Sequence, residues 1–157
     1  MSQLVKRKFL IIAFIYLTLT SSINLAQNKN FAIGFIVGEP TGISAKYWTS
    51  GINAFDFGLG YSFEKNSNLH IHGDYLFHLD NALNTSERIS IYYGPGVRLK
   101  FRQDNNSRLG VRGVLGGLWM PRGNFIDVFI EIAPVMDLIP STKFSFDGGI
   151  GVRFFLN

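Results

Sequence analysis

Three histidines and one aspartate fall on alternate positions of a single short segment. His70, His72, Asp74 and His78 stand in LHIHGDYLFHL (69–79), and alternate residues share one face of a β-strand. Imidazoles so placed can share a zinc or copper ion, but a tetrahedral site usually needs three or more ligands in close reach. A hydrogen-bond network with neighbouring Arg and Tyr is the simpler interpretation, so we expect no metal.

The same segment offers a candidate acid–base pair. His72 and Asp74 lie two residues apart and have the side chains used in proton transfer. We find no serine motif to accompany them. The glycine-rich GPG (94–96) and GGIG (148–151) fit neither a dinucleotide-binding nor a P-loop pattern, and no helix is expected after them. The sequence therefore predicts no enzyme and no cofactor.

The segment belongs to a chain in which large apolar and small or polar residues alternate. This period of two is typical of strands with unlike faces. Clusters of Gly, Pro, Asn, Asp and Ser separate the segments, as expected for turns. The predicted strands cover 31–38, 43–48, 53–63, 69–79, 89–101, 109–120, 125–138 and 144–156. Their short connections favour an all-β, up-and-down antiparallel fold with no substantial helix.

The two faces of these strands differ sharply in charge. One face is rich in Phe, Tyr, Leu and Ile and carries no charged residue. The other face carries every charge within the strands, five basic and six acidic, so these groups can pair. Its charged and histidine residues are Lys46, Asp56, His70, His72, Asp74, His78, Arg98, Lys100, Arg112, Asp127, Glu131, Asp137, Asp147 and Arg153.

The size of an eight-stranded barrel decides which face points inward. Its interior is only just wide enough to be filled by side chains, so it cannot hold the many aromatic residues of the apolar face. The polar face, mixed with Gly, Ala and Ser, fits better. This arrangement predicts a transmembrane β-barrel with lipid outside and a packed polar lumen. The alternative is a soluble, lipocalin-like barrel with its apolar face inside.

The N-terminal segment has a different composition. A basic start at Lys6, Arg7 and Lys8 precedes the apolar run 9–20 and small residues up to Ala26, the pattern of a secretory signal peptide. The run is too short to span a membrane as a helix, which takes roughly 20 residues, although a retained anchor helix is the alternative. We therefore divide the chain into a signal peptide (1–26) and a barrel (27–157).

The net charge and the absence of cysteine exclude further classes. The chain carries +4, but 12 basic and 11 acidic residues remain without Lys6, Arg7 and Lys8. A domain with nearly equal numbers of basic and acidic residues gives no support for nucleic-acid binding. With no Cys in the chain, disulfides and thiolate nucleophiles are excluded.

The chain shares several features with a known family. They are the strand number, the pattern of the two faces, the terminal GVRFFLN and the segments GEPTGISAKYW, IYYGPGVRL and FIEIAPVMDLIP. The chain resembles the small eight-stranded outer-membrane barrels of Gram-negative bacteria, the OmpA-like transmembrane domain and its OmpX-like relatives. The resemblance implies an outer-membrane location, contact with outer-membrane lipid and lipopolysaccharide, and insertion by the outer-membrane assembly machinery. The aromatic residue usual at the end of the last strand is displaced here to Phe155.

We therefore expect a monomeric outer-membrane barrel with a structural or surface-interaction role. Salt bridges, with Glu131 as the acid expected deepest in the membrane, would fill its lumen. One alternative is a surface binding module using RQDNNSR (102–108), and a second is a lipid-modifying enzyme using His72 or Asp74. The links 38–42, 64–68, 102–108 and 139–143 should share one end, with the longest link, 80–88, at the other.

Overall fold

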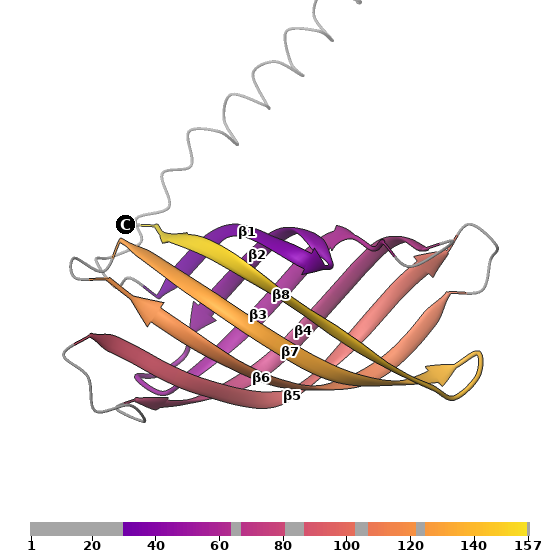
Figure 1. The fold of residues 1–157 in the computed structure, drawn as a ribbon. Coiled ribbons are helices and arrows are strands. Elements are labelled where there is room, and N and C mark those ends of the chain that lie inside the picture. The colour runs from indigo at the N-terminus through magenta and orange to yellow at the C-terminus, as the bar shows by residue number, and fades with distance from the viewer. Residues whose placement is uncertain (1–29, 64–66, 81–86, 103–106, 122–124, 157) are drawn as a thin grey trace, which may run out of the picture.

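The computed structural model describes residues 30–63, 67–80, 87–102, 107–121 and 125–156. Eight strands close into one barrel in which each strand pairs antiparallel with its neighbours in the sequence and β8 pairs with β1. Figure 1 shows the strands steeply tilted around the barrel. They are β1 (Phe31–Glu39), β2 (Thr41–Trp48), β3 (Asn53–Tyr61), β4 (Ser67–Asp80), β5 (Arg88–Arg102), β6 (Arg108–Met120), β7 (Ile126–Ile139) and β8 (Lys143–Phe155). The predicted all-β, up-and-down antiparallel fold is confirmed.

Each strand boundary lies within two residues of its predicted position. The third strand was predicted to reach Phe63, but it ends at Tyr61. The reason is a long-range contact: Ser62 Oγ donates to Glu39, and Phe63 N donates to Glu39 Oε2 at 3.0 Å. These bonds hold Ser62 and Phe63 against the end of β1. The alternation of apolar and polar residues does not predict such a contact between distant segments.

The apolar face is the outer surface of the barrel. Phe35, Phe57 and Phe146 are 63%, 49% and 67% exposed, whereas Lys46, Arg98 and Arg153 are fully buried inside. This arrangement is the reverse of an ordinary soluble barrel, in which apolar residues fill the interior. No helix in the described part of the chain is long and apolar enough to cross a membrane.

The lumen also holds an apolar cluster that our sequence analysis did not single out. Its buried members are Ile36, Leu76, Tyr92, Val114, Leu118, Met120, Phe129 and Ala133. Glycines make room for its rings, because a Cβ on Gly116 would lie 2.3 Å from Tyr92 and one on Gly151 would lie 2.3 Å from Phe129. Interior glycines are therefore part of how the lumen is packed.

The wall of the barrel is uneven. The β1–β2 hairpin is short, and in Figure 1 it stops before the rim opposite the C-terminus. The β8–β1 pairs run only from Gly148↔Glu39 to Phe155↔Ala32. Within the described chain, residues 143–147 of β8 therefore have no β1 partner.

Several sequence-based predictions concern residues that the structure does not describe. The predicted signal peptide (1–26) lies wholly outside the described residues. So does most of the links 64–68, 80–88 and 102–108.

Candidate functional site

The charged residues of the inner face form the candidate site. All fourteen residues predicted for the lumen network are buried, at 5% exposure or less. They come from every strand except β1, which contributes Glu39 at its end. Their contacts form three groups. They follow one another along the barrel from the rim opposite the C-terminal end of β8 to that end.

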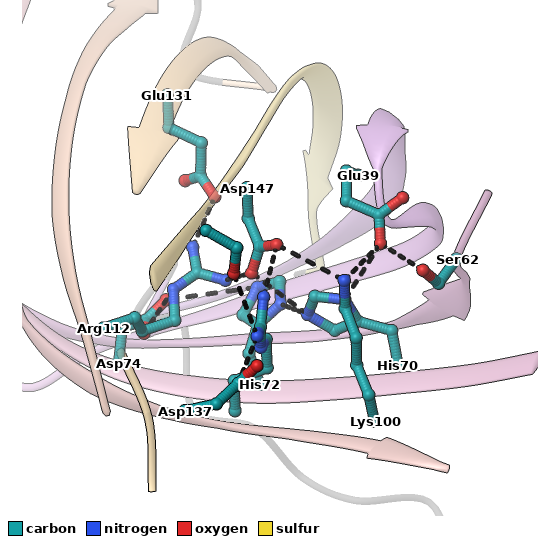
Figure 2. A network of polar contacts seen from close by, with 12 residues as sticks. Glu39, Ser62, His70, His72, Asp74, Lys100, Arg112, Glu131, Asp137 and Asp147 are labelled. Atoms are coloured by element: carbon teal, nitrogen blue, oxygen red, sulfur yellow. Dashed lines mark hydrogen bonds and ion pairs between the residues drawn. The ribbon is translucent and has the colours of Figure 1, made fainter. Parts of the chain in front are cut away.

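The rim cluster consists of Arg98, Lys100, Glu39, Asp137 and Asp147. Arg98 donates from Nη1 to Asp147 Oδ1 at 2.7 Å and from Nη2 to Asp137. Lys100 Nζ lies 2.9 Å from Glu39 Oε1 and 3.7 Å from Asp147 Oδ1. Figure 2 shows Glu39 and Asp147 facing one another with Lys100 and His70 beside them. Two cations are thus shared among three carboxylates.

The middle cluster is built around Arg112. Its Nε lies 3.2 Å from Asp74 Oδ1, its Nη1 lies 3.7 Å from Asp147 Oδ2, and its Nη2 donates to Glu131 Oε1 at 3.1 Å. Tyr92 Oη donates to the other Glu131 oxygen at 3.0 Å. One guanidinium therefore links carboxylates from three strands, β4, β7 and β8, and Asp147 joins this cluster to the rim cluster.

The inner cluster lies toward the C-terminal end of β8 and is built around Arg153. Arg153 donates from Nε to Asp127 Oδ1 at 2.9 Å and from Nη1 to Asp56 Oδ2 at 2.7 Å. Lys46 Nζ lies 3.3 Å from Asp56 and 3.2 Å from His78 Nε2. Aromatic rings cover both cations, with Arg153 Cζ 4.0 Å from the Phe129 ring centroid and Lys46 Nζ 4.5 Å from that of Tyr92. Such cation–π contacts strengthen where water is excluded.

The structure separates the three histidines. His70 and His72 contact each other through ring nitrogens 3.1 Å apart, whereas His78 lies in the inner cluster beside Lys46. A different trio, Glu39, His70 and Asp147, brings one ligand atom each within 4.8 Å of the others. The Lys100 ammonium lies against both of these carboxylates, so a protein cation already takes the position that a metal ion would need.

The two members of the candidate acid–base pair, His72 and Asp74, are not hydrogen-bonded to each other. His72 Nε2 lies 4.0 Å from Asp74 Oδ2, too far for a direct hydrogen bond. Asp74 pairs with Arg112 instead. Both side chains are enclosed in the wall and lumen, which suits a structural network better than a site that a substrate must enter.

Two members of the network were missed by sequence reasoning. Glu39 stands in the turn-like EPTG, where alternation does not assign a face, and the structure turns it into the rim cluster. Tyr92 was not singled out because Tyr93, the next residue, is also a tyrosine. The two side chains point to opposite sides of the barrel wall: Tyr92 is fully buried and Tyr93 is 47% exposed. Its position on the inner alternation was the signal that could have identified it.

Comparisons with protein-family models, with curated proteins and with solved structures find no match to this chain. The resemblance to OmpA-like barrels therefore stays a prediction. The closed eight-stranded barrel rests on the geometry itself.

Proposed function

We propose that the protein is an integral outer-membrane β-barrel with a structural or surface-interaction role and a closed lumen. The observation that carries this proposal is the inversion of the barrel, with large apolar side chains outside and the charges inside. Phe, Tyr, Leu and Ile residues that are 37–67% exposed occur on every strand. A hydrocarbon environment is the one in which such a surface is stable.

The backbone supports the same proposal. A strand that crosses a bilayer needs its N–H and C=O groups paired with neighbours, which a closed barrel provides. About 9–11 residues suffice for a tilted strand, and five of the eight strands contain 13–15. The three shorter strands, β1 to β3, contain eight or nine residues, consistent with a thinner apolar belt on that side.

The filled lumen favours a closed barrel over a channel. Arg98, Arg112 and Arg153 each pair with carboxylates inside the barrel, and an apolar cluster is buried there as well. The proposed partners are outer-membrane lipid, lipopolysaccharide and the outer-membrane assembly machinery, with the barrel itself a monomer. A binding role for the links between strands is the second candidate, but it rests largely on residues outside the described part of the chain.

A fractionation experiment tests the proposal. We expect the protein in the outer-membrane fraction, with different gel mobility in boiled and unboiled samples, because a closed barrel resists detergent until it is heated. Recovery in the soluble periplasmic fraction with no mobility shift would contradict the proposal. The exposed apolar face would then have to be covered by self-association, which sedimentation would reveal.

A further inference from the structure

Two aspartates lie directly opposite each other across β3 and β4, inside the lumen. Asp56 and Asp74 are cross-strand partners in the register of these strands, and each is only 3% exposed. Directly opposed side chains of an antiparallel pair have Cβ atoms about 4.5–5.5 Å apart, and like charges in this position destabilise a sheet. The lumen must therefore neutralise both charges or leave one of the two carboxyl groups protonated.

Asp56 is neutralised by the two cations of the inner cluster. Its Oδ2 accepts a hydrogen bond from Arg153 Nη1 at 2.7 Å and lies 3.3 Å from Lys46 Nζ. Arg153 also donates to Asp127, so two cations face two carboxylates in this cluster. The charges of the inner cluster balance with Asp56 ionised.

The middle cluster has fewer cations than carboxylates. Within the described part of the chain, Arg112 is the only Lys or Arg within ion-pair distance of Asp74 or of Glu131. Arg112 also contacts Asp147, which has two further cations in the rim cluster. One guanidinium therefore faces two carboxyl groups, Asp74 and Glu131, that depend on it alone.

Of these two acids, Asp74 is held less well as a carboxylate. Its Oδ1 lies 3.2 Å from Arg112 Nε, yet neither atom has a hydrogen-bond partner. The same oxygen lies against β5, only 1.7 Å from the position that a Cβ on Gly96 would take. Glu131, in contrast, accepts hydrogen bonds from Arg112 Nη2 at 3.1 Å and from Tyr92 Oη at 3.0 Å. Hydrogen bonds to a carboxylate favour its ionised form, so Asp74 is the acid that keeps a proton more readily.

The remaining neighbours of Asp74 do not make up the missing charge. On its own strand, His72 Nε2 lies 4.0 Å from Asp74 Oδ2, and on β5, Arg98 donates to Asp137 and Asp147 instead. Figure 2 shows Asp74 beside Arg112 in this network. We propose that Asp74 retains its proton at neutral pH and that the lumen packing weakens when alkali removes this proton. This property belongs to the interior and does not depend on the proposed location of the barrel.

Two asparagine variants of the full chain, Asp74→Asn and Asp127→Asn, test this proposal. Asparagine has the shape of a protonated aspartate but cannot ionise. Asp127 is the matched control, because it lies opposite Arg153 in the register of β7 and β8 and accepts a hydrogen bond from its Nε at 2.9 Å. Urea unfolding in detergent is followed from about pH 5 to about pH 7, where an aspartate of the unfolded chain has already lost its proton.

The two variants should respond to pH in different ways. We expect the unfolding equilibrium constant of the wild type to rise about tenfold per pH unit relative to that of Asp74→Asn, because the folded wild type binds one proton more than its unfolded chain. Asp74→Asn should therefore match the wild type at the acid end and be more stable at the neutral end. Asp127→Asn should be less stable than the wild type throughout, with an unchanged pH dependence.

Infrared spectroscopy of the wild type gives a second measurement that needs no variant. At neutral pH we expect the C=O band of a buried protonated carboxyl group, which disappears in alkali; its absence would overturn the proposal. Destabilisation of Asp74→Asn at every pH, as in Asp127→Asn, would also overturn it, because Asp74 would then be ionised and bound to Arg112. A pH dependence that is kept in Asp74→Asn but lost in Glu131→Gln or His72→Gln would place the proton on that other residue and overturn the assignment to Asp74.

Discussion

At the scale of single residues, the interior is stabilised by cations that are shared. Arg112 contacts Asp74, Asp147 and Glu131, and Arg98 contacts both Asp137 and Asp147. Buried charges are costly to remove from water, and they are tolerated only when paired and hydrogen-bonded. The guanidinium group suits this task because its donors form a rigid planar fork that can reach several carboxylates. A lysine at position 112 would reach fewer of them.

Glu131→Ala tests this sharing at one carboxylate. The change removes the acceptor of both Arg112 Nη2 and Tyr92 Oη. We expect the free energy of unfolding to fall by about 3 kcal/mol, the lower end for a broken buried pair, because Arg112 keeps Asp74 and Asp147. Urea unfolding in detergent, followed by the fluorescence of Trp48 and Trp119, measures the loss.

Glu131→Gln is the matched control for that variant. Its amide oxygen still accepts a hydrogen bond, so the loss should be nearer 1 kcal/mol. If the alanine variant unfolds at the same urea concentration as the wild type, Glu131 does not hold the middle cluster together.

The residues of the network could be identified from the sequence, but their pairings could not. Alternation assigned Asp56 and Arg153 to one face, because side chains repeat with period two. Which acid meets which base depends on barrel closure: Asp56 and Arg153 are 97 positions apart and meet across the lumen at 2.7 Å. Glu39 escaped detection because the sequence analysis placed it in the turn after the first strand, whereas it is the last residue of β1 and contacts Lys100.

At the scale of the strands, glycines on the two faces of a single strand have different functions. On β6, Gly116 faces the lumen, and a Cβ there would lie 2.3 Å from the Tyr92 ring. Gly113, three residues away, faces outward with open space above it. On β3, Gly58 makes the same kind of room for the His72 ring, 2.2 Å from the position of a Cβ. Gly58, Gly116 and Gly151 thus each leave room for one large ring in the lumen.

Gly116→Ala should therefore destabilise the barrel while Gly113→Ala should not. The added methyl on Gly116 must displace Tyr92, whose hydroxyl is bonded to Glu131, and overpacking of this kind costs about 1–3 kcal/mol. The outward methyl should change stability by less than about 0.5 kcal/mol. Thermal unfolding of the two variants in the same detergent compares them directly. Equal midpoint temperatures would show that the lumen has room for a methyl group beside Tyr92.

At the scale of the whole molecule, strand number and lumen volume limit what the barrel can do. An eight-stranded barrel has an interior that side chains can just fill, whereas barrels of 16 or more strands enclose water. Here three cation clusters and an apolar cluster lie in the interior. Strand number and the contrast between faces were readable from the sequence. The apolar cluster could not be identified from the sequence. Its members occupy inward-facing positions among Gly and Ser residues, and the charged residues at the other inward-facing positions are a stronger signal.

The closed lumen proposed above predicts that the barrel does not conduct. In planar bilayers we expect no discrete current steps after insertion, because an ion would have to break the Arg98, Arg112 and Arg153 pairings in succession to pass. A sixteen-stranded porin inserted under the same conditions provides the positive control, and a heat-dependent shift in gel mobility verifies that the preparation contains folded barrel. Stable, reproducible steps from such a preparation would mean that the charge network opens in the membrane. The buried acids and bases would then line a path for ions, and Glu131 would be the first residue to substitute in search of altered selectivity.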